Sequence, residues 1–579
     1  MSLTLHGIGV SKGIAIGKVH IINHDPVEVS ENCLPKHRLE DEVVRFENAI
    51  SLACQQLLHI RERIPKDTTV DVAGFIDAHL LMLDDSLLKK VPIDLIYEHQ
   101  CNAEWALKMQ CDNIVQLFDK MDDPYLSARK HDVVQVVTRI QRILRGYTDI
   151  SYEPAQAYLA NTIVLANDLS PADTVFMQHH GILAFATEYG GTTSHTAILA
   201  RSLGIPAIVG LRHARPYIQP NDTVIVDGEK GVILVAPDER SLRYYRVRQR
   251  EEKRYRAALS KIKTSATMTR DGAPITLHVN IEFPEDMTAV KRVGGEGIGL
   301  YRTEFLFMNR QQPPEEDEHF DAYKRVIQSL KGSPVTIRTL DLGADKQFVD
   351  SRSHEGSSAT NPALGLRAIR LCLKEPKLFK PQLRAILRAS ALGQVRMMIP
   401  MVCGLQELVQ VTKIIEEMRT ELHSKSLPFD PAMPFGVMVE VPAMALCTDL
   451  VTPYVDFLSI GTNDLIQYAL AVDRSDEAVN YLYDPLHPAV LRLIKMSIDG
   501  ATQAGKPISM CGEMASDSRY VRLLLGLGLR SFSVNPEAYL EVKQTIINSK
   551  MDGLARLAKK FLKTSSQANI AGLLEAINA

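Results

Sequence analysis

Eight apolar, strand-like runs recur between residue 267 and the end of this 579-residue chain, and a helical stretch follows each run. Alternation of strand and helix predicts a parallel sheet, and eight repeats predict that the sheet closes into a (β/α)8 barrel. The runs are ITLHVNIE, EGIGLYRTE, PVTIRTLDLG, QVRMMIPMV, FGVMVEVPA, VDFLSIGTND, KPISMCGEM and RSFSVNP. We therefore expect residues 267–579 to form one barrel domain, with the acidic segment 311–318 as a solvated loop on it.

Polar side chains stand where several of these runs end. In a barrel of this kind, the C-terminal ends of the strands form the active-site face. A single such residue is explained equally well by a surface cap or a buried ion pair, but a set at equivalent positions predicts a shared site. The set comprises Arg302, Arg338, Glu440, Asn463, Asp464 and Cys511.

The residue types in this set indicate the substrate. Glu440 and Asp464 supply the hard oxygen ligands that Mg²⁺ or Mn²⁺ prefers. Arg302, Arg338 and the later Arg474 supply guanidinium groups that bind phosphate and carboxylate oxygens in pairs, and Arg367 is a candidate for one more. A metal together with several arginines predicts a small anionic substrate that carries both groups. For Cys511, the residues alone leave two interpretations open: a packed small side chain or a proton donor.

The N-terminal half changes pattern three times. Residues 1–32 and 147–236 contain short β-rich runs, whereas residues 33–146 are helical and begin with an amphipathic seam from Leu39 to Ile60. The simplest organisation is one small α/β domain, 1–32 plus 147–236, into which a helical bundle, 33–146, is inserted. Residues 237–266 are charged and predict a linker helix, whose many basic residues we expect to be a solvated face.

The segment YGGTTSHTAILARSLGIPAIVG, residues 189–210, marks the α/β domain. A tight glycine turn and the hydroxyls of Thr193 and Ser194 precede a helix, and His195 falls in its first turn. A helix N-terminus disfavours a cation but stabilises an anion. The position therefore favours a histidine that becomes phosphorylated over one that only packs.

Composition narrows the class of protein. The 66 Lys and Arg nearly balance the 69 Asp and Glu, which argues against a nucleic-acid or membrane-surface protein that works through bulk positive charge. No apolar run is long enough to cross a bilayer. The eight cysteines form no C-x-x-C pair, so we expect reduced thiols and a cytoplasmic protein.

Together these motifs resemble Enzyme I of the bacterial sugar phosphotransferase system, the phosphoenolpyruvate–protein phosphotransferase family. The likeness spans essentially the whole chain, and many members carry Arg where this chain has Thr192. The motifs that carry it, in family order, are GGTTSHTAILARSLGIPAIVG, GIGLYRTEFLFMNR, TIRTLDLGADK, NPALGLRAIR, QLRAILRAS, FGVMVEVPA, FLSIGTNDLIQYALAVDR, DPLHPAV and MCGEMASD.

The resemblance implies a reaction and a role for each candidate residue. The phosphoryl group of phosphoenolpyruvate passes to Nε2 of His195 and then to a histidine-containing phosphocarrier protein, and pyruvate is released. Arg302, Arg338, Asn463, Asp464 and Arg474 match substrate-binding positions, and Glu440 with Asp464 matches the Mg²⁺ ligands. Cys511 matches the acid that protonates the enolpyruvate carbon. Thr174 and Asp132 match polar groups near the histidine.

The resemblance also implies an architecture. The phosphohistidine domain would swivel, the helical insert would dock the carrier, and the barrel would mediate a homodimer. Three other classes remain as alternatives. A pyruvate–phosphate dikinase or phosphoenolpyruvate synthase needs a nucleotide-binding domain, and no Walker A loop appears. A signalling adaptor would use the phosphorylation state as its output, and a metal-dependent barrel lyase would leave the His195 segment unexplained.

Overall fold

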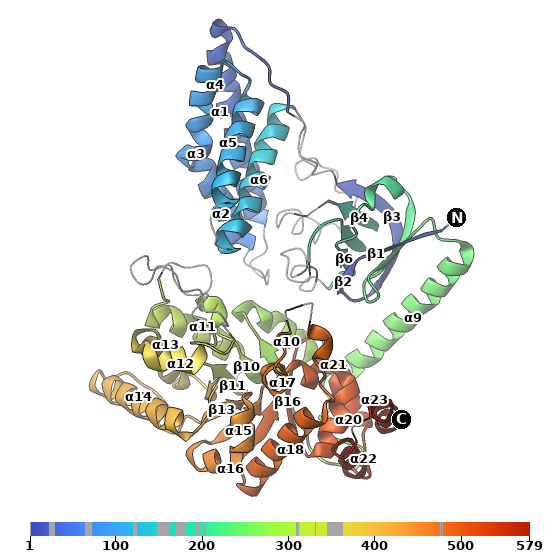
Figure 1. Cartoon of the computed structure of the whole chain (residues 1–579), viewed down its shortest axis with the longest axis vertical. Helices are drawn as coiled ribbons and strands as arrows, with labels where there is room; N and C mark the ends of the chain where they lie inside the picture. The colour runs from blue at the N-terminus through green and yellow to red at the C-terminus, as the bar shows by residue number, and fades with distance from the viewer. Residues whose placement is uncertain are drawn as a thin grey trace. The chain divides into compact units, whose positions relative to one another are not determined.

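The computed structural model divides into two compact units, Met1–Tyr255 and Arg256–Ala579 (Figure 1). The structure describes all residues of the chain except those named in the next sentence. These are residues 1, 23–28, 64–71, 120–123, 147–160, 168, 170–180, 192–196, 198, 199, 201–203, 308–311, 331, 344–362, 475, 477, 478 and 565.

The helical part of the first unit follows the predicted seam. Phe46, Ala53 and Leu57 are buried at its centre, one or two turns apart on one face of the first helix. Asp85 caps α3 by accepting a hydrogen bond from the backbone N–H of Leu87. The helices are α1 (Leu39–Arg63), α2 (Val72–Asp84), α3 (Ser86–Lys89), α4 (Val91–His99), α5 (Ala103–Asp119) and α6 (Pro124–Leu144).

An eight-stranded sheet is built from both sides of this helical insert. Its order is β1-β8-β7-β3-β4-β5-β6-β2, and β3 pairs in parallel with β4 although the helices α1–α6 separate them in sequence. The fold class predicted for this half, an α/β domain with an inserted bundle, is therefore confirmed. The strands are β1 (Leu3–His6), β2 (Ile8–Ser11), β3 (Ile14–Ile22), β4 (Thr162–Ala166), β5 (Ala184–Thr187), β6 (Ala207–Val209), β7 (Thr223–Asp227) and β8 (Val232–Val235).

Close backbone contacts hold the two ends of this sheet together. The strands β1 and β2 lie at opposite ends of the sheet order, yet only Gly7 separates them in the chain. The N–H of Gly7 donates to the carbonyl of Gly231 at 2.8 Å, and a Cβ on Gly9 would lie 2.2 Å from the carbonyl oxygen of Gly228. Glycine is required here because no side chain fits between the crossing strands.

The predicted linker helix is α9 (Glu239–Lys261). Its first turns pack on the sheet, where Tyr245 contacts Ile14 and Ile225. On the same side, Arg248 binds the buried Asp227 at 2.7 Å. The helix is thus fixed to the sheet at its N-terminal end.

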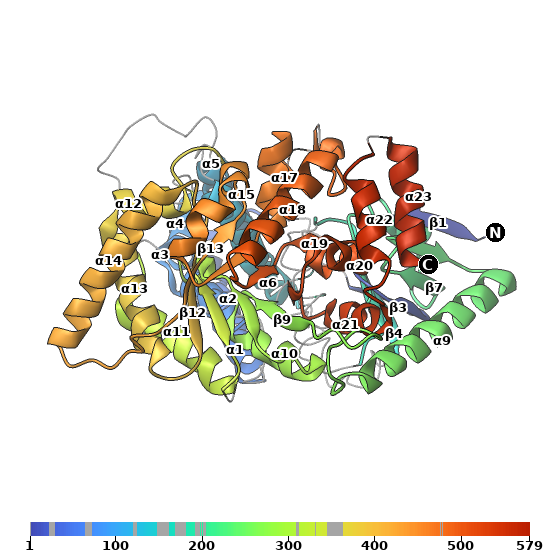
Figure 2. The ribbon, with the colours of Figure 1, turned by 90° about the horizontal axis from the view of Figure 1, so that it is seen from below.

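The second unit is the predicted parallel barrel, closed by pairing of β16 with β9. Each predicted run supplies one strand. The apolar residues that point outward from the strands pack under the surrounding helices. Figure 2 shows these helices arranged around the strands. The strands are β9 (Thr276–Ile281), β10 (Ile298–Tyr301), β11 (Val335–Arg338), β12 (Val395–Ile399), β13 (Phe435–Val439), β14 (Phe457–Ile460), β15 (Ile508–Met510) and β16 (Ser531–Val534).

Helices follow the strands around the barrel. They are α10 (Met287–Val293), α11 (Glu316–Ser329), α12 (Ala368–Lys374), α13 (Pro376–Ser390), α14 (Leu405–Ser424), α15 (Pro442–Leu446), α16 (Thr448–Val451), α17 (Thr462–Leu470), α18 (Pro488–Gln503), α19 (Glu513–Ser516), α20 (Ser518–Leu527), α21 (Tyr539–Asn548), α22 (Leu554–Phe561) and α23 (Gln567–Asn578).

The prediction of a loop over 311–318 was wrong at its C-terminal end. Glu315 caps α11 in a capping box with Glu318, so the last three residues of the segment are helical. Glu316 is also held by Arg384 at 2.5 Å and by Arg388 at 2.7 Å. The acidic run therefore begins a helix, where negative charge is favoured.

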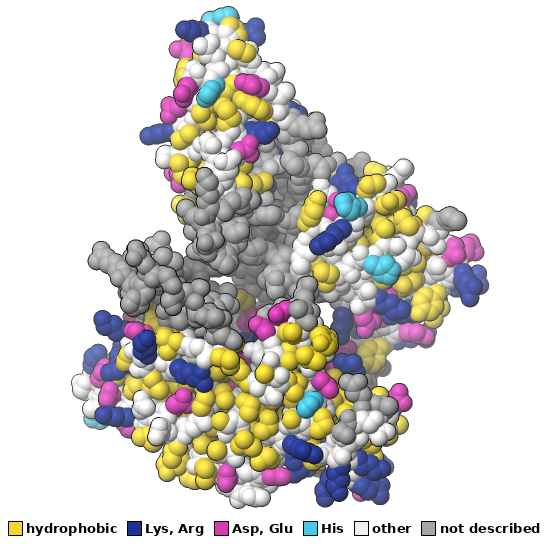
Figure 3. All heavy atoms as spheres, viewed as in Figure 1, with side chains coloured by type: hydrophobic (Ala, Val, Ile, Leu, Met, Phe, Trp, Pro, Cys, Tyr) yellow, Lys and Arg dark blue, Asp and Glu magenta, His cyan; other side chains and the backbone are white. Residues whose placement is uncertain are grey.

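One face of the barrel carries large exposed apolar side chains. Hydrophobic side chains gather over α15, α16 and α18 in Figure 3. Leu446, Leu450, Tyr454 and Met496 are each about half exposed there, and we call these four residues the apolar patch. Monomeric proteins rarely expose such side chains in a group.

Candidate active site

The predicted polar residues meet at one end of the barrel. Because all eight strands are parallel, residues that follow their C-terminal ends share one face. Arg302 follows β10, Arg338 ends β11, Glu440 follows β13 and Cys511 follows β15. Asn463 and Asp464 lie in the first turn of α17, directly after β14, where the helix dipole favours the Asp464 carboxylate.

Three carboxylates form the centre of this face. One oxygen each from Asp341, Glu440 and Asp464 lies within 4.8 Å of the others. Glu440 is only 2% exposed and accepts a hydrogen bond from the backbone N–H of Met401 at 2.6 Å. Burial, together with the charges of Asp341 and Asp464, raises the pKa of Glu440 well above its ordinary value. Three carboxylate oxygens this close together are a donor set suited to a divalent cation.

Two arginines fix Asp341 within this cluster. Arg338 lies 3.0 Å from one Asp341 oxygen, and Arg367 lies 2.8 Å from the other. Burial alone raises the pKa of Asp341, but the two guanidinium groups outweigh it and lower the pKa below its ordinary value. Asp341 is therefore held as a carboxylate whose position is set by two cations.

The same arginines reach further partners at the mouth. Arg338 also binds Glu304 at 3.1 Å, and its buried Nε–H has no partner among the described residues. Arg367 lies 3.4 Å from Asp464 and donates to the hydroxyl of Tyr468 at 3.1 Å. Burial raises the pKa of Tyr468 to about 12, so the phenol stays protonated. The face thus presents guanidinium donors directly beside the carboxylate cluster.

The remaining predicted binding residues lie around this centre. Arg302 forms an ion pair with Glu282, which follows β9. The amide oxygen of Asn463 accepts from the backbone N–H of Glu513 at 2.8 Å. Arg474 is exposed and lies 4.0 Å from the Glu513 carboxylate. Among the residues that the structure describes, no hydrogen bond or ion pair joins these three side chains to the carboxylate cluster, so their part in binding stays a prediction.

Cys511 lies just inside the barrel. It is 3% exposed and packs with Leu300, Met398, Met438 and Phe457. Its Sγ is 3.4 Å from the hydroxyl of Ser459 and 3.7 Å from the carbonyl oxygen of Ile460. Burial raises the pKa of the Cys511 thiol, so the side chain is a neutral S–H near neutral pH. A protonated thiol beside the mouth has the form that a proton donor requires.

Sequence reasoning missed two residues of this face of the barrel and gave a third only a secondary part. Asp341 and Glu304 were not singled out, and Arg367 was considered only as an additional phosphate ligand. The signal for Asp341 was present, because it stands three residues after Arg338 at the end of β11. Arg367 comes from a distant segment, and only the folded chain brings it to Asp341.

The segment around the predicted phosphohistidine is only partly described. His195, Thr192 and Thr174 lie outside the described residues. Ala197 and Ala200 are helical and buried, as the predicted helix requires. Asp132 lies on α6, where its carboxylate is 4.0 Å from Nε2 of His79.

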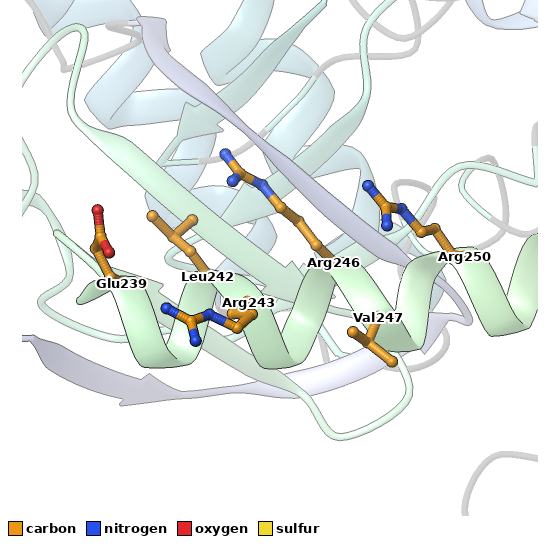
Figure 4. Close-up of a pocket in the computed structure, with 6 residues that line it drawn as sticks. All are labelled: Glu239, Leu242, Arg243, Arg246, Val247 and Arg250. Atoms are coloured by element: carbon orange, nitrogen blue, oxygen red, sulfur yellow. The ribbon is translucent and has the colours of Figure 1, made fainter.

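A shallow hollow also lies along α9. Figure 4 shows Leu242, Arg246 and Arg250 projecting from the same side of the helix, with Glu239 at its start. Arg246 and Arg250 are exposed to solvent. This matches the solvated basic face expected for the linker. Among the described residues, no helix is both long and apolar enough to cross a membrane.

Family models assign the chain to the phosphoenolpyruvate-utilising enzymes. A family described as "PEP-utilising enzyme, PEP-binding domain" matches residues 256–551. The families described as "PEP-utilising enzyme, N-terminal" and "PEP-utilising enzyme, mobile domain" match residues 6–129 and 159–231.

Relatives along the full chain narrow this class to one family. A protein named "Phosphoenolpyruvate-protein phosphotransferase" from Cupriavidus necator is 43% identical over 97% of each chain. Proteins of the same name from Listeria monocytogenes and Bacillus subtilis are 39% and 38% identical over 100% and 99% of each chain. The chain belongs to the phosphoenolpyruvate–protein phosphotransferase family, Enzyme I of the phosphotransferase system.

Proposed function

We propose how the residues of this chain divide the phosphotransferase reaction among them. The chain is a phosphoenolpyruvate–protein phosphotransferase, which moves the phosphoryl group of phosphoenolpyruvate to a histidine in the phosphotransferase system. The observation that carries the assignment of the site is the cluster of Asp341, Glu440 and Asp464 beside Arg338 and Arg367 at the barrel mouth.

The barrel mouth binds phosphoenolpyruvate in this proposal. Arg302, Arg338, Arg474 and the amide of Asn463 bind the phosphate and carboxylate oxygens. The free Nε–H of Arg338 supports this role, since a buried donor without a partner gains most from a ligand oxygen. Arg302 would exchange Glu282 for the substrate.

Glu440 and Asp464 hold Mg²⁺ in this proposal, with Asp341 beside them. Their fit is supported by the carboxylate oxygens of the three residues, which lie within 4.8 Å of one another. A bound Mg²⁺ would supply positive charge to the phosphoryl oxygens during transfer. The residues of the cluster orient the substrate and keep its oxygens apart from bulk water.

His195 accepts the phosphoryl group through Nε2. The phosphorus–oxygen bond of phosphoenolpyruvate breaks as the nitrogen–phosphorus bond forms, and the required approach is about 3–3.5 Å in line. The enolate that leaves takes a proton at its methylene carbon from the thiol of Cys511, which yields pyruvate. The neutral state of the buried thiol supports this role.

The phosphorylated His195 then passes the group to a histidine-containing phosphocarrier protein. We propose the helices α1–α6 as the docking surface. Their exposed apolar side chains support this, because Leu58 on α1, Leu81 on α2 and Leu117 on α5 are turned to solvent rather than to the bundle core.

The barrel mediates a homodimer in this proposal, and a second copy of the chain covers the apolar patch. Homodimer interfaces are more apolar than other protein surfaces, as this patch is. We also place the protein in the cytoplasm, which is supported by its eight cysteines all being free thiols.

The site assignment is tested by the dependence of pyruvate formation on Mg²⁺. Wild-type protein with an excess of carrier should form pyruvate from phosphoenolpyruvate only when Mg²⁺ is added. The Glu440→Ala variant should form none at any Mg²⁺ concentration tested. Turnover that persists in this variant would remove Glu440 from the metal site.

A further inference from the structure

A line of hydroxyl groups ends at the sulfur of Cys511. The hydroxyl of Ser509 donates to Oγ of Ser459 at 3.1 Å, and the hydroxyl of Ser459 donates to Sγ of Cys511 at 3.4 Å. The Cys511 S–H in turn faces the carbonyl oxygen of Ile460 at 3.7 Å, which leaves the sulfur free to accept from Ser459.

Strand geometry places these groups together inside the barrel. Ser459 on β14 is directly opposite Ser509 on β15 in the parallel register. Cys511 follows Ser509 by two residues, and side chains two apart along a strand point to the same face. All three therefore point into the barrel, with Cys511 nearest the mouth.

The surroundings make a hydroxyl here unusual. Barrel interiors are commonly filled by bulky branched side chains. Ser459 is 1% exposed, and the side chains grouped with Cys511 are apolar. A buried hydroxyl is costly unless it is hydrogen-bonded. Here the hydroxyl is satisfied by Ser509 on one side and directed at sulfur on the other.

We propose that Ser459, oriented by Ser509, is a positioning residue that stabilises the sulfur of Cys511 as it gives up its proton. This inference rests on the acid role of Cys511 in the proposed function. The S–H bond breaks, a C–H bond forms at the methylene carbon of the enolate, and the electron pair stays on sulfur as a thiolate. The serine O–H bonds stay intact.

The hydrogen bond from Ser459 changes strength during this step. A neutral thiol is a weak acceptor, whereas a thiolate accepts a charge-assisted hydrogen bond that is roughly twice as strong. An interaction that strengthens as charge develops lowers the barrier of the step. Ser509 adds to the effect because its own donated bond polarises the hydroxyl of Ser459.

Charged groups also face Cys511 from the neighbouring strands. Arg338 after β11 and Arg302 after β10 favour the thiolate, whereas Glu440 after β13 disfavours it. These groups also bind substrate or metal in the proposed function, so they cannot serve as selective probes of the acid. Ser459 and Ser509 are the neutral groups whose removal leaves those charges in place.

The experiment measures pyruvate formed in a single turnover by rapid quench, as a function of pH. The variants are Ser459→Ala and Ser509→Ala. The matched control is Ser497→Ala, which removes a buried serine hydroxyl on α18 that donates to the Leu493 carbonyl, away from the site. Phosphoryl exchange between the enzyme and the carrier is measured for each protein, because that step does not involve Cys511.

We expect Ser459→Ala to slow pyruvate formation about tenfold, the size expected when one hydrogen bond to a developing charge is lost. In this variant, the fall in the rate of pyruvate formation at alkaline pH should move to higher pH, since the thiolate of Cys511 is less stabilised. Ser509→Ala should show smaller changes in the same directions. Ser497→Ala should match wild type, and carrier exchange should be unchanged in all three.

Two results would overturn the inference. In one, both serine variants form pyruvate at the wild-type rate. In the other, the rate falls while the alkaline limb stays fixed, as a packing defect would produce. Measuring the Cys511→Ala variant in the same way distinguishes failure of this inference from failure of the proposed function. If that variant forms pyruvate at the wild-type rate, the acid assignment fails and this inference falls with it.

Discussion

The Asp341 carboxylate lies 3.0 Å from the guanidinium of Arg338, three residues earlier at the end of the same strand. This ion pair joins the carboxylate cluster to the groups that we propose bind phosphate. A change at one therefore alters the other, although only Arg338 was expected to belong to the site.

The Asp341→Asn variant tests this link. Asparagine keeps the shape of the side chain but removes the charge that faces Arg338 and Arg367. We expect the Mg²⁺ concentration for half-maximal pyruvate formation to rise about tenfold or more, the scale seen when groups that orient metal ligands are lost. The exposed Asp321 on α11 offers a control, and Asp321→Asn should leave the Mg²⁺ titration unchanged. An unchanged titration in Asp341→Asn would remove Asp341 from the site.

The Glu440→Gln variant tests the electrostatic repulsion among the carboxylates of the cluster. Glutamine still accepts from the Met401 N–H but cannot ionise beside the carboxylates of Asp341 and Asp464. Without added metal, we expect the melting temperature to rise by about 1–2 °C, the shift that about 1 kcal/mol produces in a unit of more than 300 residues. Thermal unfolding in a chelator measures this shift. Added Mg²⁺ should raise the melting temperature of wild type but not that of the variant. A rise in the variant and none in wild type would contradict the account.

The stability of the metal-free protein should also depend on pH. The pKa of Glu440 is raised in the folded state, so this state binds the proton more tightly than the unfolded chain does. Its contribution to stability is therefore present below the unfolded pKa and is lost as the pH rises toward the folded pKa. Wild type without metal should lose stability over this range relative to Glu440→Gln, and parallel pH curves for the two proteins would contradict this expectation.

The Cys511→Ala variant tests the proton donor. We expect pyruvate formation to slow by about 100-fold or more, since general acids contribute at least this factor. Phosphoryl exchange with the carrier should be unaffected, because it involves no proton transfer to carbon. In wild type, the raised pKa of the thiol places the alkaline loss of pyruvate formation above the ordinary thiol range. Equal loss of both activities in the variant would contradict the acid role.

The Leu450→Asp variant tests the apolar patch. Leu450 is 62% exposed on α16, and a buried carboxylate would oppose contact with a second copy. We expect the dimer dissociation constant, measured by sedimentation, to rise about tenfold or more. Val409 on α14 is similarly exposed, so Val409→Asp is the matched control and should not change association. If neither variant changes association, the dimer does not use the patch.

The barrel was predictable because its signal is local. Each strand is a short apolar run bounded by polar residues, and parallel strands buried on both sides require such runs. The bounds of the helix α4 and of the strand β1 within the N-terminal half were not predicted, for the opposite reason. Three of the four β1 residues are exposed, and α4 is short and begins with a proline after a brief turn. Their places depend on pairing and packing with distant segments.

The residues of the site divide in the same way, into those that the local sequence indicates and those that only the folded chain brings together. Glu440, Asp464 and Arg338 stand at strand ends, where position alone indicates a role. The pairing of Arg367 with Asp341 joins residues 26 apart, and the line from Ser509 to Cys511 depends on register between two strands. No local pattern encodes these contacts. The residue boundaries proposed for the four domains also stay predictions, although the sheet contains strands from both sides of the helical insert.

The most direct test of the central claim is phosphorylation by labelled phosphoenolpyruvate. Wild-type protein and the His195→Ala variant are incubated with phosphoenolpyruvate labelled in the phosphoryl group and with Mg²⁺, and protein-bound label is then tested for acid lability. The account predicts acid-labile label on wild type and none on the variant. Equal labelling of the two proteins, or none on folded wild type, would contradict it.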